Sequence, residues 1–330
     1  MKYLHQAERE GKKFLNPVPT KLSTGSNLLT LLWKYFRNKA ETTPKQQPGP
    51  FTTDPSTYQK PSSTGLRITW IGHSSLLIEI NGKKILTDPV WSERVSFSSV
   101  IGPKRFFPAP LKLNELPSLD AIIISHDHYD HLDKSVIKEF ANREIPFYTS
   151  LRVGRYLEEW GIKASLVREL DWMDKVMIGD TCELTALPAR HFSGRNLFNR
   201  FETLWSSFVI KTNKHNIFFG ADSGWFEGFK EIGDSYGPFD LTMLEIGAYN
   251  ENWADIHMGP ENAVHAHIAL KGKLMMPIHW GTFNLALHAW REPVERILKY
   301  AREKNVQLFL PKPGEPTEVS DQSYNSEWWL

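Results

Sequence analysis

The fold of this chain is decided by Ser125-His126-Asp127-His128-Tyr129-Asp130-His131-Leu132-Asp133, directly after the apolar run 121–124. Three imidazoles and two carboxylates thus lie between residues 126 and 131, at the end of a predicted buried strand. Packing does not explain this concentration, because such groups prefer water to a protein core. Neutral imidazoles with a carboxylate suit zinc or another first-row divalent ion. In an extended loop, residues 126, 128 and 130 point to one side, so one segment can serve two adjacent metals.

Three further apolar strands end in a residue that can bind a metal. His191 follows the run 184–190, Asp222 follows 217–221, and His279 follows 274–278. Strand ends at one edge of a sheet sandwich can converge in space although they are far apart in the sequence. Alone, each of these residues would be read as structural. Together with the 126–131 cluster they predict a single metal site.

Length and composition bound the class of protein. A chain of 330 residues can bury a large core, and 41% hydrophobic and 23% charged residues are ordinary for a soluble globular protein. The net charge of +1 and the lack of a concentrated basic run argue against a nucleic-acid partner. The N-terminus is polar, with no secretory signal, and no stretch reaches about 18 uninterrupted apolar residues. We therefore expect a cytoplasmic protein without a transmembrane helix.

The sequence divides into two regions. Residues 1–65 are rich in proline and predict an irregular arm with one amphipathic helix at about 25–39, whereas 66–330 predict the catalytic domain. Within the second region strands come first and then alternate with helices, and this order occurs twice. The expected strands are 67–70, 75–80, 83–87, 121–125, 146–150, 165–168, 174–178, 182–187, 208–212, 216–219, 241–245 and 274–277. The expected helices are 134–142, 153–160, 260–269 and 293–303.

The order H-x-H-x-D-H, His, Asp, His resembles the metallo-β-lactamase superfamily. Within it, the chain is most similar to the N-acylphosphatidylethanolamine-hydrolysing phospholipase D family. The segments that carry this resemblance are 16–20 (NPVPT), 69–73 (TWIGH), 86–89 (LTDP), 101–106 (IGPKRF), 237–240 (GPFD), 246–249 (IGAY) and 278–283 (IHWGTF). The resemblance implies an α/β fold, an αβ/βα sandwich of four layers with two mixed sheets and outer helices. It also implies a two-metal site at one edge.

The resemblance further implies ligands for two zinc ions, although other divalent ions would also suit the set. The first zinc would be bound by His126, His128 and His191, the second by Asp130, His131 and His279, and Asp222 would bridge the two. Two metals can share a hydroxide and clamp phosphoryl oxygens, so Asp130 and Asp222 are expected to be catalytic as well as metal-binding. A carboxylate bridge favours hydrolysis over redox chemistry.

Other residues match the family less fully. His257 would polarise the phosphate or protonate the leaving group, or else support the metal ligands from behind. Tyr249 and Trp253 are expected to contact the substrate. In this stretch Ile256 departs from the pattern, since mammalian-type enzymes have a polar side chain there.

Three residues near the expected site remain open to more than one interpretation. Asp88 is expected to orient the metal loop, because ligating imidazoles usually need a hydrogen-bond acceptor behind them. Asp127 stands where close relatives often carry Asn, and it either adds negative charge beside the metals or caps the following turn. For His73 a packed histidine at the sheet edge is favoured over a catalytic residue, and its role is left open.

The predicted function is a phospholipase D that hydrolyses N-acylphosphatidylethanolamine-like lipids to N-acylethanolamine and phosphatidic acid. The alternative is a zinc-dependent lactonase or carboxylester hydrolase acting on a small soluble substrate. A phospholipid must be taken from a membrane, so we expect peripheral contact through the 28–37 helix. Its insertion residues would be Leu29, Leu32, Trp33 and Phe36. Lipase-like relatives form dimers, and the resemblance therefore implies a homodimer.

Overall fold

The computed structural model describes residues 1–23, 39–196 and 198–330. The helix expected at about 25–39 falls almost wholly outside the described residues. So do its four expected insertion residues, Leu29, Leu32, Trp33 and Phe36. The described part of the arm holds the short hairpin β1 (Arg9–Glu10) and β2 (Lys13–Phe14) and the 3-10 turn η1 (Pro55–Gln59).

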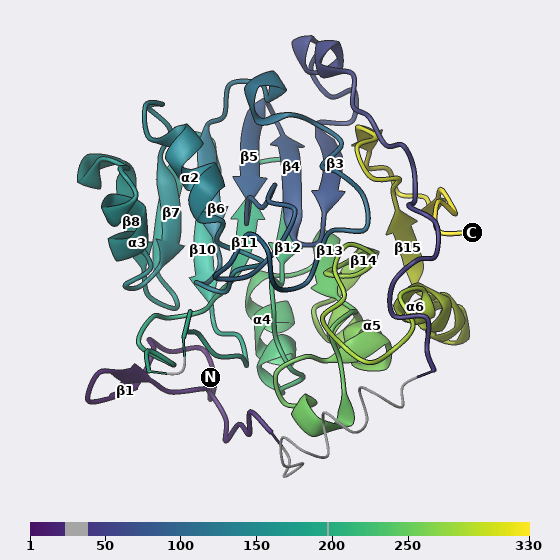
Figure 1. The fold of residues 1–330 in the computed structure, drawn as a ribbon. Coiled ribbons are helices and arrows are strands. Elements are labelled where there is room, and N and C mark those ends of the chain that lie inside the picture. Colours follow the sequence, from purple (N-terminus) through teal and green to yellow (C-terminus); the bar gives the residue numbers. More distant parts are fainter. Residues whose placement is uncertain (24–38, 197) are drawn as a thin grey trace.

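Two mixed sheets form the central layers of the domain (Figure 1). The seven-stranded sheet has the order β16-β3-β4-β5-β6-β7-β8 and the eight-stranded sheet the order β17-β15-β14-β13-β12-β11-β10-β9. The first sheet comprises β3 (Leu66–Gly72), β4 (Ser75–Ile80), β5 (Lys83–Thr87), β6 (Ala121–Ile124), β7 (Phe147–Ser150), β8 (Val167–Leu170) and β16 (Thr317–Glu318). The second comprises β9 (Lys175–Ile178), β10 (Cys182–Leu187), β11 (Ser207–Lys211), β12 (Asn216–Phe219), β13 (Phe239–Glu245), β14 (Gly272–Ile278), β15 (Gln307–Leu310) and β17 (Tyr324–Asn325).

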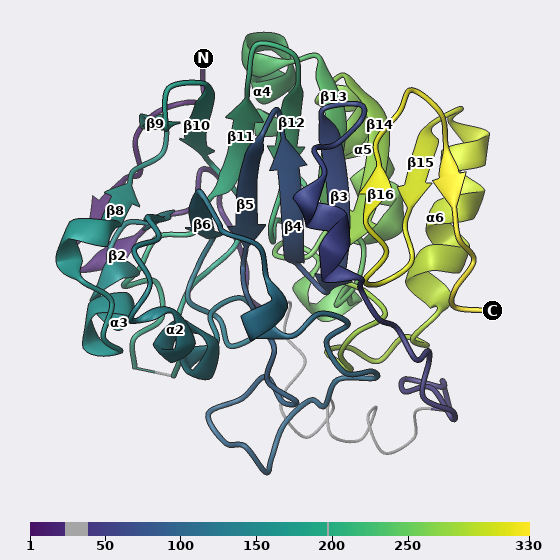
Figure 2. The same ribbon diagram turned by 90° about the horizontal axis from the view of Figure 1, so that it is seen from above.

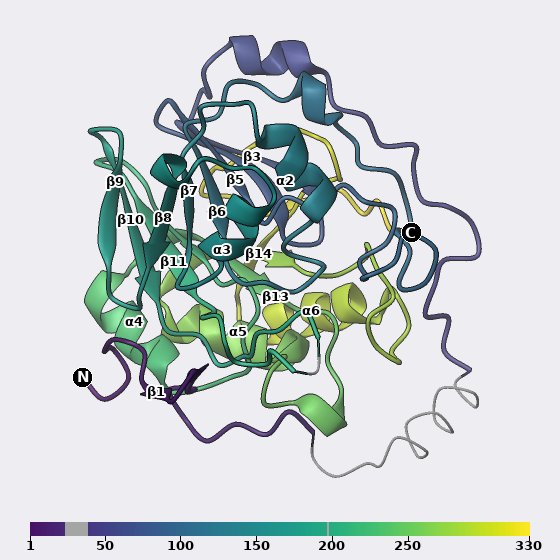
Figure 3. The same ribbon diagram turned by 60° about the vertical axis from the view of Figure 1, so that its left-hand side comes forward.

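Helices cover the outer face of each sheet, which confirms the predicted αβ/βα sandwich (Figures 1 and 3). The seven-stranded sheet carries α2 (Lys134–Phe140) and α3 (Gly154–Glu159). The eight-stranded sheet carries α4 (Gly228–Tyr236), α5 (Gly259–Ala269) and α6 (Glu292–Glu303). Short 3-10 turns lie at Leu113–Glu115, Ala164–Leu166 and Glu251–Trp253. None of the helices in the described residues is long and apolar enough to cross a membrane.

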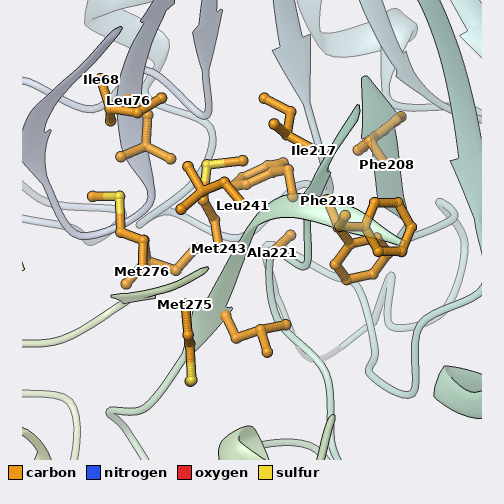
Figure 4. Close-up of a cluster of buried hydrophobic side chains, with 14 of the residues drawn as sticks. Ile68, Leu76, Phe208, Ile217, Phe218, Ala221, Leu241, Met243, Met275 and Met276 are labelled. Carbon is orange, nitrogen blue, oxygen red and sulfur yellow. The ribbon is translucent and has the colours of Figure 1, made fainter. Parts of the chain in front are cut away.

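The main core lies between the two sheets. Ile68 and Leu76 face it from the first sheet, and Phe208, Leu241 and Met243 from the second (Figure 4). The opposite face of the first sheet packs on α2 and α3 in a separate apolar cluster, so its strands are covered on both sides. This explains the almost unbroken apolar runs in the sequence, since a strand buried on both faces loses the alternating pattern.

The pairing of the strands brings distant segments to one edge. Strands β5 to β8 run parallel, as do β12 to β15. The carboxyl ends of parallel strands meet at the same side of a sheet, where ligands usually bind. The segments that follow β6, β12, β13 and β14 therefore leave the sandwich at a common edge.

Most expected elements are present, with two notable omissions from the prediction. No helix was expected at α4 and no strand at β15. The α4 segment contains Gly228 and Gly233, which lower helix propensity. At Gly233 a Cβ atom would lie 2.1 Å from the carbonyl oxygen of Ala269, so close packing of α4 on α5 requires glycine there. The strand expected at 165–168 begins instead at Val167, after a 3-10 turn.

Candidate metal centre

Four of the expected ligands form a first cluster at the shared sheet edge. His126 and His128 follow β6, whereas His191 follows β10 in the other sheet. The His128 Nδ1 atom lies 2.9 Å from His126 Nε2 and 3.3 Å from His191 Nε2. The Asp222 Oδ2 atom, beyond the end of β12, is 3.6 Å from His191 Nε2 and 3.9 Å from His126 Nε2. These four ligand atoms lie close enough together to hold one metal ion.

The remaining expected ligands form a second cluster beside the first. Asp222 Oδ2 lies 3.2 Å from His131 Nε2, and Asp222 Oδ1 lies 3.2 Å from His279 Nε2. Asp130 Oδ2 is 3.4 Å from His279 Nε2 and 3.8 Å from His131 Nε2. His73 joins this cluster, since its Nε2 lies 3.0 Å from Asp130 Oδ2. The structure thus brings all seven expected ligands together, with Asp222 between the two groups.

The donor set fits metal ions. His131 Nε2, His279 Nε2 and Asp222 Oδ1 are buried and, within the described chain, lack a hydrogen-bond partner. Buried polar atoms without partners are costly and therefore rare. Several converging at one point are explained if a cation satisfies them, and the imidazole and carboxylate chemistry is that of zinc and similar ions.

The charge around the two clusters differs. Burial, reinforced by neighbouring imidazoles, holds the pKa of His126 far below its usual range, and burial does the same to the pKa of His191. These rings are therefore neutral, as ligation requires. At the second cluster burial also opposes charge, but Asp222 and Asp130 outweigh it and raise the pKa of His131 and, to about 10, the pKa of His279. This is a field that attracts cations.

Asp88 holds one ligand of each cluster, as expected of a residue that orients the metal loop. Its buried carboxylate accepts hydrogen bonds from the Ser125 amide (2.7 Å), the Ser125 hydroxyl (2.6 Å) and His131 Nδ1 (2.7 Å). The Ser125 Oγ atom in turn lies 2.9 Å from His126 Nδ1. Since the Ser125 proton is directed to Asp88, His126 Nδ1 donates to Oγ and its Nε2 is left with a free lone pair. Asp88 therefore presents both rings to the metals through Nε2.

Asp127 points away from both clusters and pins a neighbouring loop. Its Oδ1 accepts a hydrogen bond from the Gly194 amide at 2.6 Å. Arg195, next in the chain, donates to the carbonyl oxygens of Asp127 and Leu132. The guanidinium also lies 3.9 Å from the ring centroid of Tyr129. The printed bond of the Asp127 carboxylate is therefore not a cap of the following turn, as one of the two interpretations expected; it ties the segment after His191 to the 126–131 loop.

The partly exposed His257 pairs with the buried Glu245 beside the metal clusters. Glu245 ends β13, accepts a hydrogen bond from the Ser223 amide, and lies 2.6 Å from His257 Nδ1. Burial lowers the pKa of His257, but Glu245 outweighs that effect and raises it. The ring lines the metal cavity, with Nε2 left for a ligand. Glu245 was not predicted, although an acidic residue that ends an apolar strand is the signal that could have found it.

The metal clusters open into a cavity of about 510 Å³, lined by His128, Asp130, Asp222, His257 and His279 together with apolar and basic side chains. A second cavity of about 860 Å³ adjoins it, and Trp253 and Leu285 line both. Trp253, which was expected to contact the substrate, lines both cavities, and its role stays a prediction. Tyr249 lies outside the lining of both cavities, because its hydroxyl donates to Glu292 and its ring stacks on His288.

Strained backbone marks the strand ends at this site. Positive φ angles occur at His73 (56°), Asp88 (35°), Ala221 (48°) and His279 (62°), none of which is glycine. Such conformations cost free energy and persist where the surrounding structure enforces them, often at functional sites. The resulting sharp bends turn side chains toward the common edge. His279 is itself an expected ligand and Ala221 directly precedes Asp222, whereas Asp88 and His73 bond to the ligands His131 and Asp130.

Comparison with known proteins agrees with this geometry. A family model described as "Beta-lactamase superfamily domain" matches residues 83–280. The chain belongs to the metallo-β-lactamase superfamily. It is a metal-dependent hydrolase of that superfamily. Its 126–131 loop and the strand ends at His191, Asp222 and His279 are the superfamily pattern from which membership was predicted.

Several relatives are similar over most of the chain. An uncharacterized protein of Mycobacterium tuberculosis is 42% identical over 96% of this chain and 85% of its own. The N-acyl-phosphatidylethanolamine-hydrolyzing phospholipase D 1 of Caenorhabditis elegans is 37% identical over 79% of this chain and 78% of its own. Among solved structures, an isothiocyanate hydrolase from Delia radicum gut bacteria superposes with a TM-score of 0.64 at 20% identity, over 77% of this chain and 99% of its own. The last likeness concerns the fold alone.

Proposed function

We propose that this hydrolase is a phosphodiesterase of phospholipase D type that cleaves N-acylphosphatidylethanolamine-like lipids to N-acylethanolamine and phosphatidic acid. The observation that carries the proposal is the second cavity beside the metal clusters. Apolar side chains, among them Phe106, Trp253, Leu285 and Leu287, form much of its lining. A substrate with an acyl chain can place its phosphate at the metals and its chain in this cavity, whereas a small lactone would leave the cavity unused. The similarity to the phospholipase D of Caenorhabditis elegans supports the same choice.

Two zinc ions are the proposed cofactor, because the chain offers two adjoining sets of nitrogen and oxygen donors that share Asp222. When bound, such a pair lowers the pKa of a coordinated water and neutralises charge on phosphoryl oxygens. His126, His128 and His191 would hold the first ion and Asp130, His131 and His279 the second.

The residues of the chain supply the remaining chemistry. Hydrolysis breaks the bond between phosphorus and the ethanolamine oxygen, and water supplies a hydroxyl to phosphorus and a proton to the departing oxygen. His257 is placed to give that proton from Nε2, since Glu245 holds its Nδ1. Asp130 and Asp222 line the cavity and orient the attacking water. Trp253, between the two cavities, positions the substrate.

The test compares three substrate classes on the zinc-loaded protein: N-acylphosphatidylethanolamine in mixed micelles, bis-p-nitrophenyl phosphate, and a panel of lactones. We expect turnover of the lipid to phosphatidic acid and N-acylethanolamine, identified by mass. Lactone turnover without lipid turnover would refute the proposal and support the carboxylester hydrolase instead.

His257→Gln tests the proton donor. Loss of a general acid costs about 10²- to 10⁴-fold in rate, and bound zinc should not change, because His257 is not among the proposed ligands. His265→Gln is the matched control, since this exposed histidine on α5 is remote from the clusters. If His257→Gln keeps full lipid turnover, the assignment of the proton is wrong.

A further inference from the structure

Four large apolar side chains on loops beside the metal cavity are exposed to solvent. Phe97, Val100 and Ile101 are 81%, 76% and 66% exposed, and Phe198 is 93% exposed. We call these four residues the apolar tips. The first three belong to the connection between β5 and β6, which projects beyond both sheets (Figure 2). Most other exposed large apolar side chains among the described residues occur singly and elsewhere, at chain ends, on β9 or on α5.

The two loops that carry the tips meet at the metal cavity. Phe97 and Asn196 line the same surface cleft of about 700 Å³, which shares Tyr129 and Arg195 with the metal cavity. Val95 of the first loop and Asn196 of the second also line the metal cavity itself. A surface that covered the tips would therefore face the metal clusters.

The first loop is closed at its base, and several of its amides are bonded within the loop. Arg94 and Lys104 pair as an antiparallel bridge at its base, and the Arg94 side chain donates to the Gly102 carbonyl oxygen. Gly102 has φ 116°, and a Cβ atom there would lie 2.4 Å from the Cβ of Ser96, so the loop closes tightly. At the tip, Ser98 Oγ accepts from the amides of Val100 and Ile101.

Among the described residues of the second loop, four amides are bonded to asparagine side chains of the same loop. Asn196 Oδ1 accepts from the amides of Phe198 and Asn199, and Asn199 Oδ1 accepts from those of Arg195 and Asn196. Amides that are already bonded within the loop can leave water at low cost, which an unpaired backbone cannot. Both tips therefore suit an apolar environment.

The charge of the cleft between the loops is complementary to an anionic surface. Four basic and three acidic side chains line it. Two of the three carboxylates are engaged: Asp133 caps α2, and Glu93 pairs with Lys104. Lys134 and Lys138 of α2 remain exposed on its wall. Exposed lysines near a membrane surface attract acidic lipid headgroups.

From these observations we propose that the apolar tips insert into the interface of a lipid bilayer and dock the metal cavity against it. The choice of a bilayer rests on the function proposed above, the hydrolysis of a membrane lipid. The tips lie outside the 28–37 segment from which membrane contact was expected, and that earlier expectation stays a prediction because the segment lies outside the described residues. Substrate would then pass from the bilayer to the metal clusters between the two loops, past Val95 and Asn196, which line the metal cavity.

The test is sedimentation of the zinc-loaded protein with vesicles of phosphatidylcholine, alone or mixed with phosphatidylglycerol. The variants are Phe97→Ser combined with Ile101→Ser, and Phe198→Ser. Met177→Ser and Ile268→Ser are matched controls, because these side chains are 47% and 48% exposed on β9 and α5. We expect vesicle binding to fall roughly tenfold for each large tip side chain removed, with the controls unchanged. Phosphatidylglycerol should strengthen binding by the wild type, and added salt should reverse that gain.

Thermal melting and bound zinc should be equal in all variants, which excludes misfolding as the cause. Equal vesicle binding by wild type and tip variants, or no binding by the wild type, would overturn the inference. So would a wild-type dimer that the tip substitutions dissociate, because the tips would then join two copies of this chain. Vesicle binding that depends on the tips, without lipid hydrolysis in micelles, would instead refute the proposed function and leave the docking surface standing.

Discussion

Asp88→Asn should weaken metal binding at both clusters, although Asp88 is not among the proposed ligands. The Ser125 amide can only donate, so the oxygen of the new side chain must take the place of Oδ1. Its NH₂ group then takes the place of Oδ2 and donates toward His131 Nδ1 and Ser125 Oγ. His131 must accept at Nδ1 and carry its proton on Nε2. The Ser125 hydroxyl, now an acceptor from the amide, donates to His126 Nδ1, and that ring too is protonated at Nε2.

The magnitude follows from the bonds that are inverted. The charge-assisted hydrogen bond from His131 Nδ1 to Asp88 is replaced by a neutral bond in the opposite direction. The bond between Ser125 Oγ and His126 Nδ1 is reversed as a consequence. A hydrogen bond to a charged group contributes about 1.5–3 kcal/mol. Each cluster should therefore bind zinc roughly 10- to 100-fold more weakly, which matches the range for residues that support metal ligands.

The assay is competition for zinc against a chromophoric chelator, at equal protein concentration. Asp180→Asn is the control, because it removes one negative charge at an exposed turn remote from the site. Circular dichroism should show that Asp88→Asn remains folded in excess zinc. A folded variant with unchanged zinc affinity at both clusters would refute the argument that Asp88 sets which nitrogen of each ring faces the metals.

Further predictions follow from the same contacts. Asp222→Asn should bind fewer than two zinc ions by elemental analysis, and two retained zincs with full activity would rule out the shared ligand. Asp127→Ala should lower the unfolding free energy by about 1–3 kcal/mol in urea, since it orphans the Gly194 amide, whereas Asp127→Asn should not. Arg105→Met removes the buried donor to the carbonyls of Ile71, Val90 and Phe107 and should cost about 2–4 kcal/mol, measured likewise. Chelation should lower the melting temperature reversibly by scanning calorimetry, because metal bound at about a thousandfold its Kd stabilises by about 4 kcal/mol; an unchanged melting temperature would argue against bound metal.

The architecture was predictable where the pattern is local. The apolar run before the 126–131 loop and the parallel strand–helix units appear in the sequence as they do in the structure. The helix α4 was missed, because Gly233 lowers helix propensity and is required only by contact with α5. The strand β15 spans four residues, three of them apolar, and so short an apolar run does not distinguish a strand from a helix until its pairing with β14 is known. Such long-range contacts leave little trace in a local pattern.

In the site, too, residues that belong to a local sequence pattern were predicted, and those placed by long-range contacts were not. Its seven expected ligands were found because each follows a strand and belongs to a recognisable order. For His73 packing was favoured over catalysis, and its approach to Asp130 depends on pairing between segments 57 residues apart. Arg195 acts on the ligand-bearing loop from another element and carries no spacing that could be read. Glu245 could have been found, because it is an acidic residue that ends an apolar strand. The tips at Phe97 and Phe198 are ordinary apolar residues until the fold shows that nothing described covers them.

Each metal cluster takes ligands from both sheets: His126 and His131 from beyond β6, His191, Asp222 and His279 from the other layer. Bound ions would therefore link the two sheets at the open edge of the sandwich. The hydrogen bond from the His279 amide to the His73 carbonyl oxygen also joins the sheets there. Metal binding and the packing of the two sheets against each other are then thermodynamically linked. Loosening the core at Met243 or Phe208 should then weaken zinc binding without touching a ligand. In the same way, the metal-free protein should exchange its amide hydrogens first along this edge.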